Sequence, residues 1–162
     1  MADEKKYYPA VAFHFKVKID DIPDDDGDSR FQSVSGLTAE LETETRKEGG
    51  ENRFEHVLPL RIKYPQLVLK RGLISSKSLR KWCLDNINAV SNLVSADPSK
   101  RLITPKNLTV SMLNENHEEI MTWNIVHAWP KKWSIADLNA EQSAIAVETI
   151  ELQYWYFTVK EK

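Results

Sequence analysis

The sequence predicts a mostly β fold, a single-domain β-barrel or sandwich with one α-helix at about residues 78–90. Three observations support this fold class. Several segments alternate apolar and polar residues with a period of two, which is typical of strands with one buried face. Only one segment repeats its apolar residues at helical spacing. The chain of 162 residues matches the usual size of one domain, so we expect residues 1–162 to form a single domain.

The first strand is expected at residues 13–19, where the sequence FHFKVKI alternates between apolar and polar residues. One face of this strand should be buried, and the other should meet water or a partner. The acidic segment at residues 20–29 lacks the ligand order of an EF-hand calcium site. We therefore interpret it as a solvated loop.

A second strand is expected over residues 37–45, and it carries a row of glutamates. Two sets of side chains alternate along it: Leu37, Ala39 and Leu41 on one face, and Glu40, Glu42 and Glu44, the glutamate row, on the other. Because an unpaired buried charge is very costly, the glutamate row should face water.

A long loop is expected after this strand, over residues 47–59. Gly49 and Gly50 permit positive φ there, and Pro59 closes the segment. The segment is too long for a tight hairpin turn, and loops of this length in compact domains are often functional.

A strand, a turn and the helix are expected in immediate succession. Residues 66–71 alternate as a strand, Gly72 ends it, and nearby serines such as Ser78 suit a helix start. The apolar face of the helix comprises Leu79, Trp82, Cys83 and Ile87, which we expect in the core. A single cysteine excludes an intrachain disulfide, and its place on this face predicts a buried structural thiol.

More strands are expected in the second half of the chain. Residues 108–112 and 121–125 alternate on either side of a polar turn and predict a hairpin. Residues 144–159 predict a last strand or strand pair. The phase of the alternation shifts within it, which indicates either a β-bulge or burial of both faces.

Composition and motifs exclude several functions. The formal net charge of -2 and the pI near 6.1 argue against a general nucleic-acid binder. No run approaches the ~18 apolar residues that span a bilayer, and the N-terminus lacks the apolar region of a signal peptide. We therefore expect synthesis in the cytoplasm and no membrane insertion. The four histidines match no zinc spacing, and no catalytic or nucleotide-binding motif is present, so we expect no enzyme activity, metal or cofactor.

Six segments, taken in order, carry a family resemblance: FQSVSGL, ETETRKEGGEN, LPLRIKYPQLVLKRG, SLRKW, MTWNIVHAWPKKW and AIAVETIEL. Together they run over nearly the whole chain and resemble the tail tube family of contractile phage tails, including the inner tube proteins of extracellular contractile injection systems. The resemblance implies a compact β-barrel-like fold with one helix. It also implies hexameric rings that stack as a hollow tube inside a sheath.

The resemblance implies partners and site residues as well. The expected partners are identical copies in stacked hexameric rings, the sheath protein, baseplate or hub proteins, tube-capping proteins, and a cargo effector or DNA in the lumen. The glutamate row is expected to line that lumen. The loop that comprises Lys47, Glu48, Gly49, Gly50, Glu51, Asn52 and Arg53 is expected to reach a neighbouring subunit or ring. The product would be a virion tail or an injection particle, which can be released outside the cell.

Two alternatives to a main tube subunit stay open. A tube-initiating or terminating paralogue would share the core and cap the stack at the baseplate or the distal end. A β-sandwich ligand-binding module would instead use Trp129 and Trp155 as an aromatic platform. Rings or tubes support the first two functions, whereas a monomer with a soluble ligand supports the third.

Overall fold

The structure is a computed structural model that describes residues 15–23, 31–47, 49–50, 53–73, 77–91, 102–136 and 145–161. These residues form nine strands and one helix. Their bounds are β1 Phe15–Ile19, β2 Ser33–Ser35, β3 Glu40–Arg46, β4 His56–Lys63, β5 Leu67–Gly72, α1 Ser78–Ser91, β6 Lys106–Leu113, β7 Glu119–Ile135, β8 Val147–Gln153 and β9 Tyr156–Glu161. The predicted mostly β class with one helix is confirmed.

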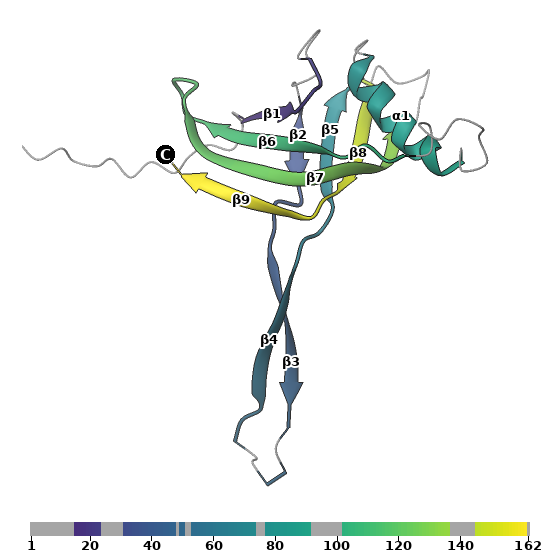
Figure 1. Cartoon of the computed structure of the whole chain (residues 1–162). Coiled ribbons are helices and arrows are strands. Elements are labelled where there is room, and N and C mark those ends of the chain that lie inside the picture. The colour runs from purple at the N-terminus through teal and green to yellow at the C-terminus, as the bar shows by residue number, and fades with distance from the viewer. Residues whose placement is uncertain are drawn as a thin grey trace, which may run out of the picture.

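Seven strands form one antiparallel sheet in the order β1-β6-β7-β8-β5-β2, and β9 pairs with β7. The long strand β7 belongs to two parts of this sheet. Its first half pairs with β6 and β9. Its second half pairs with β8 from Trp129 onward, with a register shift between Pro130 and Lys132. The sheet therefore folds into two layers whose strands cross, as Figure 1 shows. We call β1, β6, the first half of β7 and β9 the β9 layer, and β2, β5, β8 and the second half of β7 the β5 layer.

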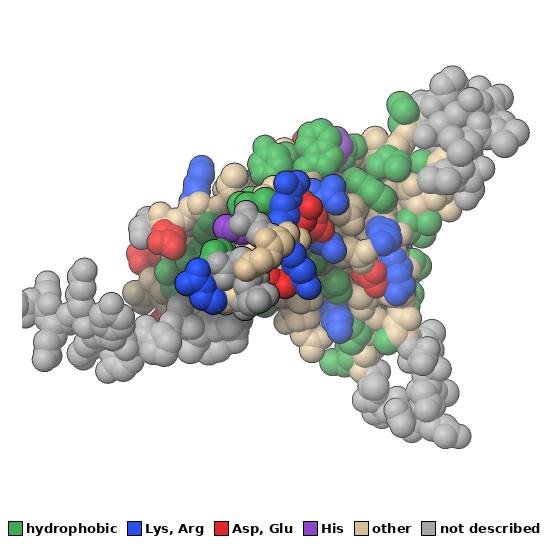
Figure 2. All heavy atoms as spheres, turned by 90° about the horizontal axis from the view of Figure 1, so that it is seen from below, with side chains coloured by type: hydrophobic (Ala, Val, Ile, Leu, Met, Phe, Trp, Pro, Cys, Tyr) green, Lys and Arg blue, Asp and Glu red, His purple; other side chains and the backbone are tan. Residues whose placement is uncertain are grey.

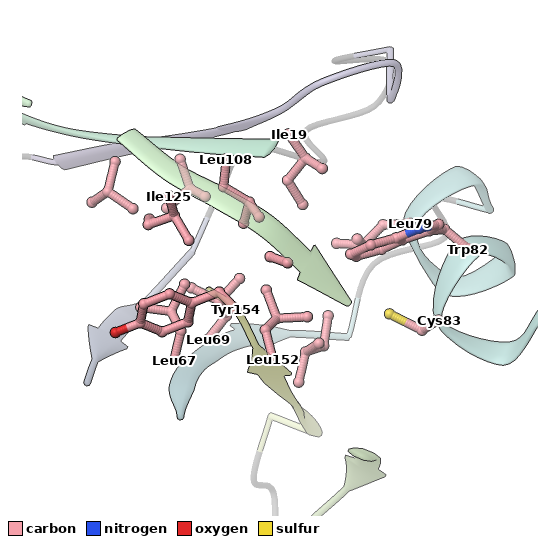
Figure 3. Packing of buried hydrophobic residues seen from close by; sticks show 14 residues of the cluster. Ile19, Leu67, Leu69, Leu79, Trp82, Cys83, Leu108, Ile125, Leu152 and Tyr154 are labelled. Atoms are coloured by element: carbon pink, nitrogen blue, oxygen red, sulfur yellow. The ribbon is translucent and has the colours of Figure 1, made fainter. Parts of the chain in front are cut away.

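The hydrophobic core lies between the two layers. Alternation along each strand turns one set of side chains inward, so buried residues recur at every second position. The β9 layer contributes Val17, Ile19, Leu108, Val110 and Ile125, and the β5 layer contributes Leu67, Leu69, Ile150 and Leu152. Figure 3 shows these two sets facing each other across the core. Burying each such side chain stabilises the fold by about 1.5–3 kcal/mol.

Helix α1 packs against one end of this core through Leu79, Trp82 and Cys83, which are all buried (Figure 3). Ile87, expected in the core, is only half-buried, because Asn86 occupies the inward position in the next turn. The Asn86 amide donates to the Trp82 carbonyl and accepts a hydrogen bond from the Thr104 backbone N–H at 2.7 Å. Trp82 Nε1 donates to the Thr104 carbonyl at 2.8 Å. These bonds tie the segment before β6 to the helix.

A buried ion pair lies within the β5 layer, and a residue of the helix approaches it. Arg71 on β5 lies directly opposite Glu148 on β8, and both side chains are fully buried. The distance from Arg71 Nε to Glu148 Oε2 is 2.7 Å. Trp133 Nε1 also donates to this carboxylate, and Arg80 of α1 lies 4.0 Å from it. Glu148 therefore connects three strands and the helix through one buried group.

Strands β3 and β4 form a separate two-stranded sheet that projects from the body (Figure 1). The predicted loop at residues 47–59 is wrong in its second part, because β4 already begins at His56 and includes Pro59. The predicted last strand is confirmed as a pair, β8 and β9. Residues 13–14 of the first predicted strand and residues 24–29 of the acidic segment lie outside the described residues.

Candidate assembly surfaces

The hairpin of β3 and β4 is held at its base by a close approach of two chain segments. Gly36, between β2 and β3, has φ of +95°, and a Cβ at this position would lie 2.0 Å from the Gln66 carbonyl oxygen. Only glycine fits both the space and the backbone angle. The Tyr154 hydroxyl donates to the Gly36 carbonyl at 3.1 Å, so the core of the protein fixes where the hairpin leaves it.

The glutamate row lies on β3, on a hairpin face that also carries basic side chains. Glu40 lies opposite Lys63, and the Arg61 guanidinium donates from Nε to Glu42 Oε2 at 2.7 Å. This hydrogen bond, together with the charge of Arg61, lowers the pKa of the Glu42 carboxyl. The acidic strand therefore has basic partners on the neighbouring strand of the same hairpin. The glutamate row is one half of a face with mixed charges.

The other hairpin face is apolar although it is open to solvent. Leu41 lies opposite Ile62, and their exposed fractions are both 54%. Val57 is 59% exposed beside Thr45. Every residue of β4 is exposed. An isolated two-stranded hairpin is marginally stable in water, and contiguous exposed apolar side chains mark interaction sites. This hairpin thus has the features of an element that another surface covers.

The connection at the hairpin tip is the loop expected to contact a neighbour. Lys47, Gly49, Gly50 and Arg53 are exposed, whereas Glu48, Glu51 and Asn52 lie outside the described residues. Gly50 has φ of +98°, and no atom of the described residues lies within 4 Å of a Cβ placed on either Gly49 or Gly50. The eight residues of β4 span about 27 Å at the usual rise of a strand. The hairpin therefore carries the loop well beyond the body (Figure 1).

The β9 layer has a polar outer face opposite its core face. Register places Lys16, Ser111, Thr122 and Lys160 in one row across the four strands, and Lys18, Thr109, Asn124 and Thr158 in the next. Ser111 Oγ donates to Glu119 Oε1 at 3.1 Å within this face. Several of these residues line an open groove with Glu161. Sequence alternation indicated the face, but the partners along each row follow only from the register.

The two edges of the β9 layer match each other. Among the described residues, β1 pairs only with β6, and β9 pairs only with β7. The four strands alternate in direction, so β1 and β9 run antiparallel to one another. An unpaired strand edge is a template for pairing with another chain.

The described residues contain no group of three or more side chains that could hold a metal ion. No helix formed by the described residues is long and apolar enough to cross a membrane. Trp155, one of two residues considered for an aromatic platform, is 61% exposed and stacks on His127 at a centroid distance of 3.6 Å. Trp129 is only partly exposed. Burial raises the pKa of the Cys83 thiol to about 12, which agrees with a structural thiol and not a nucleophile.

The chain is similar to known proteins over most of its length. The sequence model of the family described as "T4-like virus tail tube protein gp19" matches residues 11–158. A chain in the cryo-EM structure of the anti-feeding prophage baseplate is 28% identical, with a TM-score of 0.75, and the match covers 95% of this chain and 97% of that one. No curated protein sequence gives a significant match.

Two further structures show the fold at lower identity. A chain of the sheath-tube complex of the extracellular contractile injection system PVC is 24% identical with a TM-score of 0.76, and the match covers 97% of this chain and 95% of that one. A chain of the anti-feeding prophage tube-terminating cap is 23% identical with a TM-score of 0.72, with coverages of 96% and 93%.

Proposed function

Because the chain belongs to the T4-like virus tail tube protein gp19 family, as its sequence resemblance predicted, we propose that it forms hexameric rings that stack into the hollow inner tube of a contractile injection particle or phage tail. The family is structural and non-enzymatic. The chain is accordingly a tail tube protein whose activity is assembly.

The pair of matching edges on the β9 layer is the observation that carries the proposal. When copies are related by rotation about a common axis, β9 of one copy comes beside β1 of the next. Because β1 and β9 run antiparallel, they can form the same kind of ladder that joins the strands within each copy. Such a head-to-tail contact closes into a ring and leaves no exposed edge. We expect subunit interfaces of about 2,000 Å² or more, the range of obligate contacts.

Two surfaces are candidates for the wall of the passage. The polar face of the β9 layer is one, because its opposite face forms the core and cannot border water. The hairpin face with the glutamate row is the other, as the sequence predicted. In a closed ring, either surface repeats around the axis. The hairpin face would give a wall of mixed charge, since Arg61 and Lys63 accompany the glutamates.

Partners of the assembled tube follow from the same assignment. We propose that the tube contacts a sheath on its outside and a baseplate at one end, and that it carries an effector or DNA. The related chains occur in a baseplate and in a sheath-tube complex. The exposed loop at the hairpin tip is proposed to contact a neighbouring subunit or ring.

A tube-initiating or terminating subunit is the second candidate function. The similarity to a chain of a tube-terminating cap, with a TM-score of 0.72, keeps it open. Purified protein distinguishes the two functions by the length of its assemblies. A main tube subunit should form long stacks in negative-stain micrographs, whereas a terminating subunit should stop at single rings or short stacks. A monomer at micromolar concentration in every buffer would contradict both.

Thiol labelling of assembled tubes tests which surface borders the passage. T122C places a thiol on the polar face, and E44C places one on the hairpin. A residue in the passage should react with a small maleimide and stay protected from a maleimide joined to a large polymer. The native protein is the control, because its single thiol, Cys83, is buried. Equal reaction of the E44C protein with both reagents would contradict a place in the passage for the glutamate row.

A further inference from the structure

The two strands of the projecting hairpin carry opposite charges. On β3, three glutamates against one arginine give a formal charge of -2. On β4, Arg61 and Lys63 without any acidic residue give a formal charge of +2, with His56 neutral. In the view from below, basic and acidic side chains lie side by side where the hairpin points toward the viewer (Figure 2). The hairpin thus has an acidic strand along one edge and a basic strand along the other.

We propose that the hairpins of neighbouring copies pair edge to edge, with β3 of one copy beside β4 of the next, and that the glutamate row of the first copy recognises Arg61 and Lys63 of the second. The proposal rests on the proposed ring and adds the rule by which copies choose their orientation. The partner is a second copy because both complementary edges lie on the same element of this chain.

The edges are available for this contact. Among the described residues, β3 and β4 pair only with each other, so each keeps one unpaired edge. Neither edge is covered, since all of β4 and all of β3 except Glu42 are exposed. Pairing in this order also brings the apolar faces of adjacent hairpins together. Leu41, Val57 and Ile62 of successive copies would then form one continuous band that shields them from water.

The charges favour one edge order over the others. Opposite charges on adjacent strands stabilise a sheet, and like charges directly opposite each other destabilise it. Contact between two β3 strands would set one glutamate row against another, and contact between two β4 strands would set Arg61 and Lys63 against the same residues. Only β3 beside β4 is favourable. This contact is head-to-tail, which is the type that closes rings.

The geometry within one copy shows that such a pair forms between these two strands, at the register shift between Leu41 and Thr43. Glu42 and Arg61 already meet between β3 and β4 at 2.7 Å. Glu40 makes no ion pair with a described residue, and Lys63 approaches Glu42 only to 3.9 Å. Both groups therefore keep capacity for a neighbour, at the strand spacing of about 4.8 Å that every sheet repeats.

The proposal can be tested by reversing the charges of one hairpin strand in each of two variants and then mixing the two variants. The variants E40K/E42K/E44K and R61E/K63E each place like charges on both strands of the hairpin. At a given concentration, each variant alone should form about tenfold fewer rings, as the reversal of two cross-strand pairs predicts, because β4 carries only Arg61 and Lys63 as basic residues. Mixed one to one, the two variants can alternate around a ring, and every contact between copies becomes attractive again. Mixing should return assembly to near the native level, and added salt should weaken the rescue.

The mixture separates contacts between copies from contacts within one copy. Mixing cannot repair the hairpin of either chain, because each chain keeps its own like charges. Failure of the mixture, while the variant with all five reversals assembles normally, would overturn the proposal and leave the pairs a role inside one hairpin only. A matched control, D85K/E115K, changes charge at exposed positions outside the hairpin and should assemble like the native protein.

A disulfide test works in any oligomer and so distinguishes failure of the pairing from failure of the ring. Chains with E40C and chains with K63C, mixed and oxidised, should form a covalent dimer between the two kinds of chain. E40C alone and K63C alone should form none. A dimer from E40C alone, or none from the mixture, would overturn the pairing whether or not rings form. Native protein without rings, but with the mixed dimer, would overturn the proposed function and keep the pairing.

Discussion

The buried ion pair of Arg71 and Glu148 makes a sharp prediction about stability. Glu148→Gln keeps the shape of the side chain and removes its charge, while Arg71 stays buried without its counter-ion. Removing one partner of a buried pair costs about 3–5 kcal/mol, because the remaining charge is left uncompensated. Glu148 also accepts from Trp133 and lies 4.0 Å from Arg80, so the cost should fall in the upper half of this range. Domains of this kind unfold with only about 5–15 kcal/mol, so the loss is a large fraction of the total.

The double replacement R71M/E148L provides the matched comparison. Replacing both partners with apolar groups of similar volume is often neutral or stabilising. Here Trp133 would lose its acceptor, which costs about 1–3 kcal/mol. The double variant should therefore be more stable than E148Q. Urea denaturation followed by tryptophan fluorescence measures both, at a protein concentration below that needed for assembly. A loss under ~1 kcal/mol for E148Q, or a double variant less stable than E148Q, would refute the reasoning.

Three further predictions follow from the core and the hairpin. Trp82→Ala should lower the free energy of unfolding by ~3–5 kcal/mol. W82F should cost less, because it keeps an aromatic ring in the core and loses the bond to Thr104 with only part of the ring volume. A stable W82A protein that fails only in assembly would place this helix face in an interface. Burial raises the pKa of Cys83 and of Tyr154 to about 12, above their usual 9.0 and 10.0, so the folded state holds both protons more tightly. The stability contributed by these two protonated groups should be intact below pH 9 and should fall as the pH rises toward 12. Over that pH range, the urea midpoint of the C83A/Y154F variant should therefore fall less than that of the native protein. Replacing the glutamate row with glutamine should weaken ring formation and its dependence on salt; unchanged assembly with altered cargo retention would instead support the passage role alone.

Sequence periodicity predicted those parts of the fold in which one face of an element meets the core of the same chain. Strand β5, with Leu67 and Leu69 inward, and helix α1 around Trp82 are examples. Arg71 was not predicted to be buried, although it lies in phase with these two leucines. The signal was present, but a charged residue is almost never fully buried unless it is paired. Its partner, Glu148, lies 77 positions away on a strand whose register the sequence does not show.

The hairpin shows why the assembly surfaces were harder to predict. Charged residues over Glu40–Arg46 alternate with Leu41, Thr43 and Thr45. This pattern looks the same whether the uncharged face covers the chain's own core or a neighbouring copy. The expected loop at residues 47–59 includes the first half of β4, because Pro59 and the preceding glycines resemble loop signals, yet proline is tolerated in edge strands. Both strands lie outside the core, so packing within this chain does not set their pattern. In the proposed ring, a neighbouring copy would cover the exposed Leu41 and Ile62. An isolated copy should therefore expose an apolar surface that rings conceal, and an environment-sensitive dye should lose its signal as assembly proceeds.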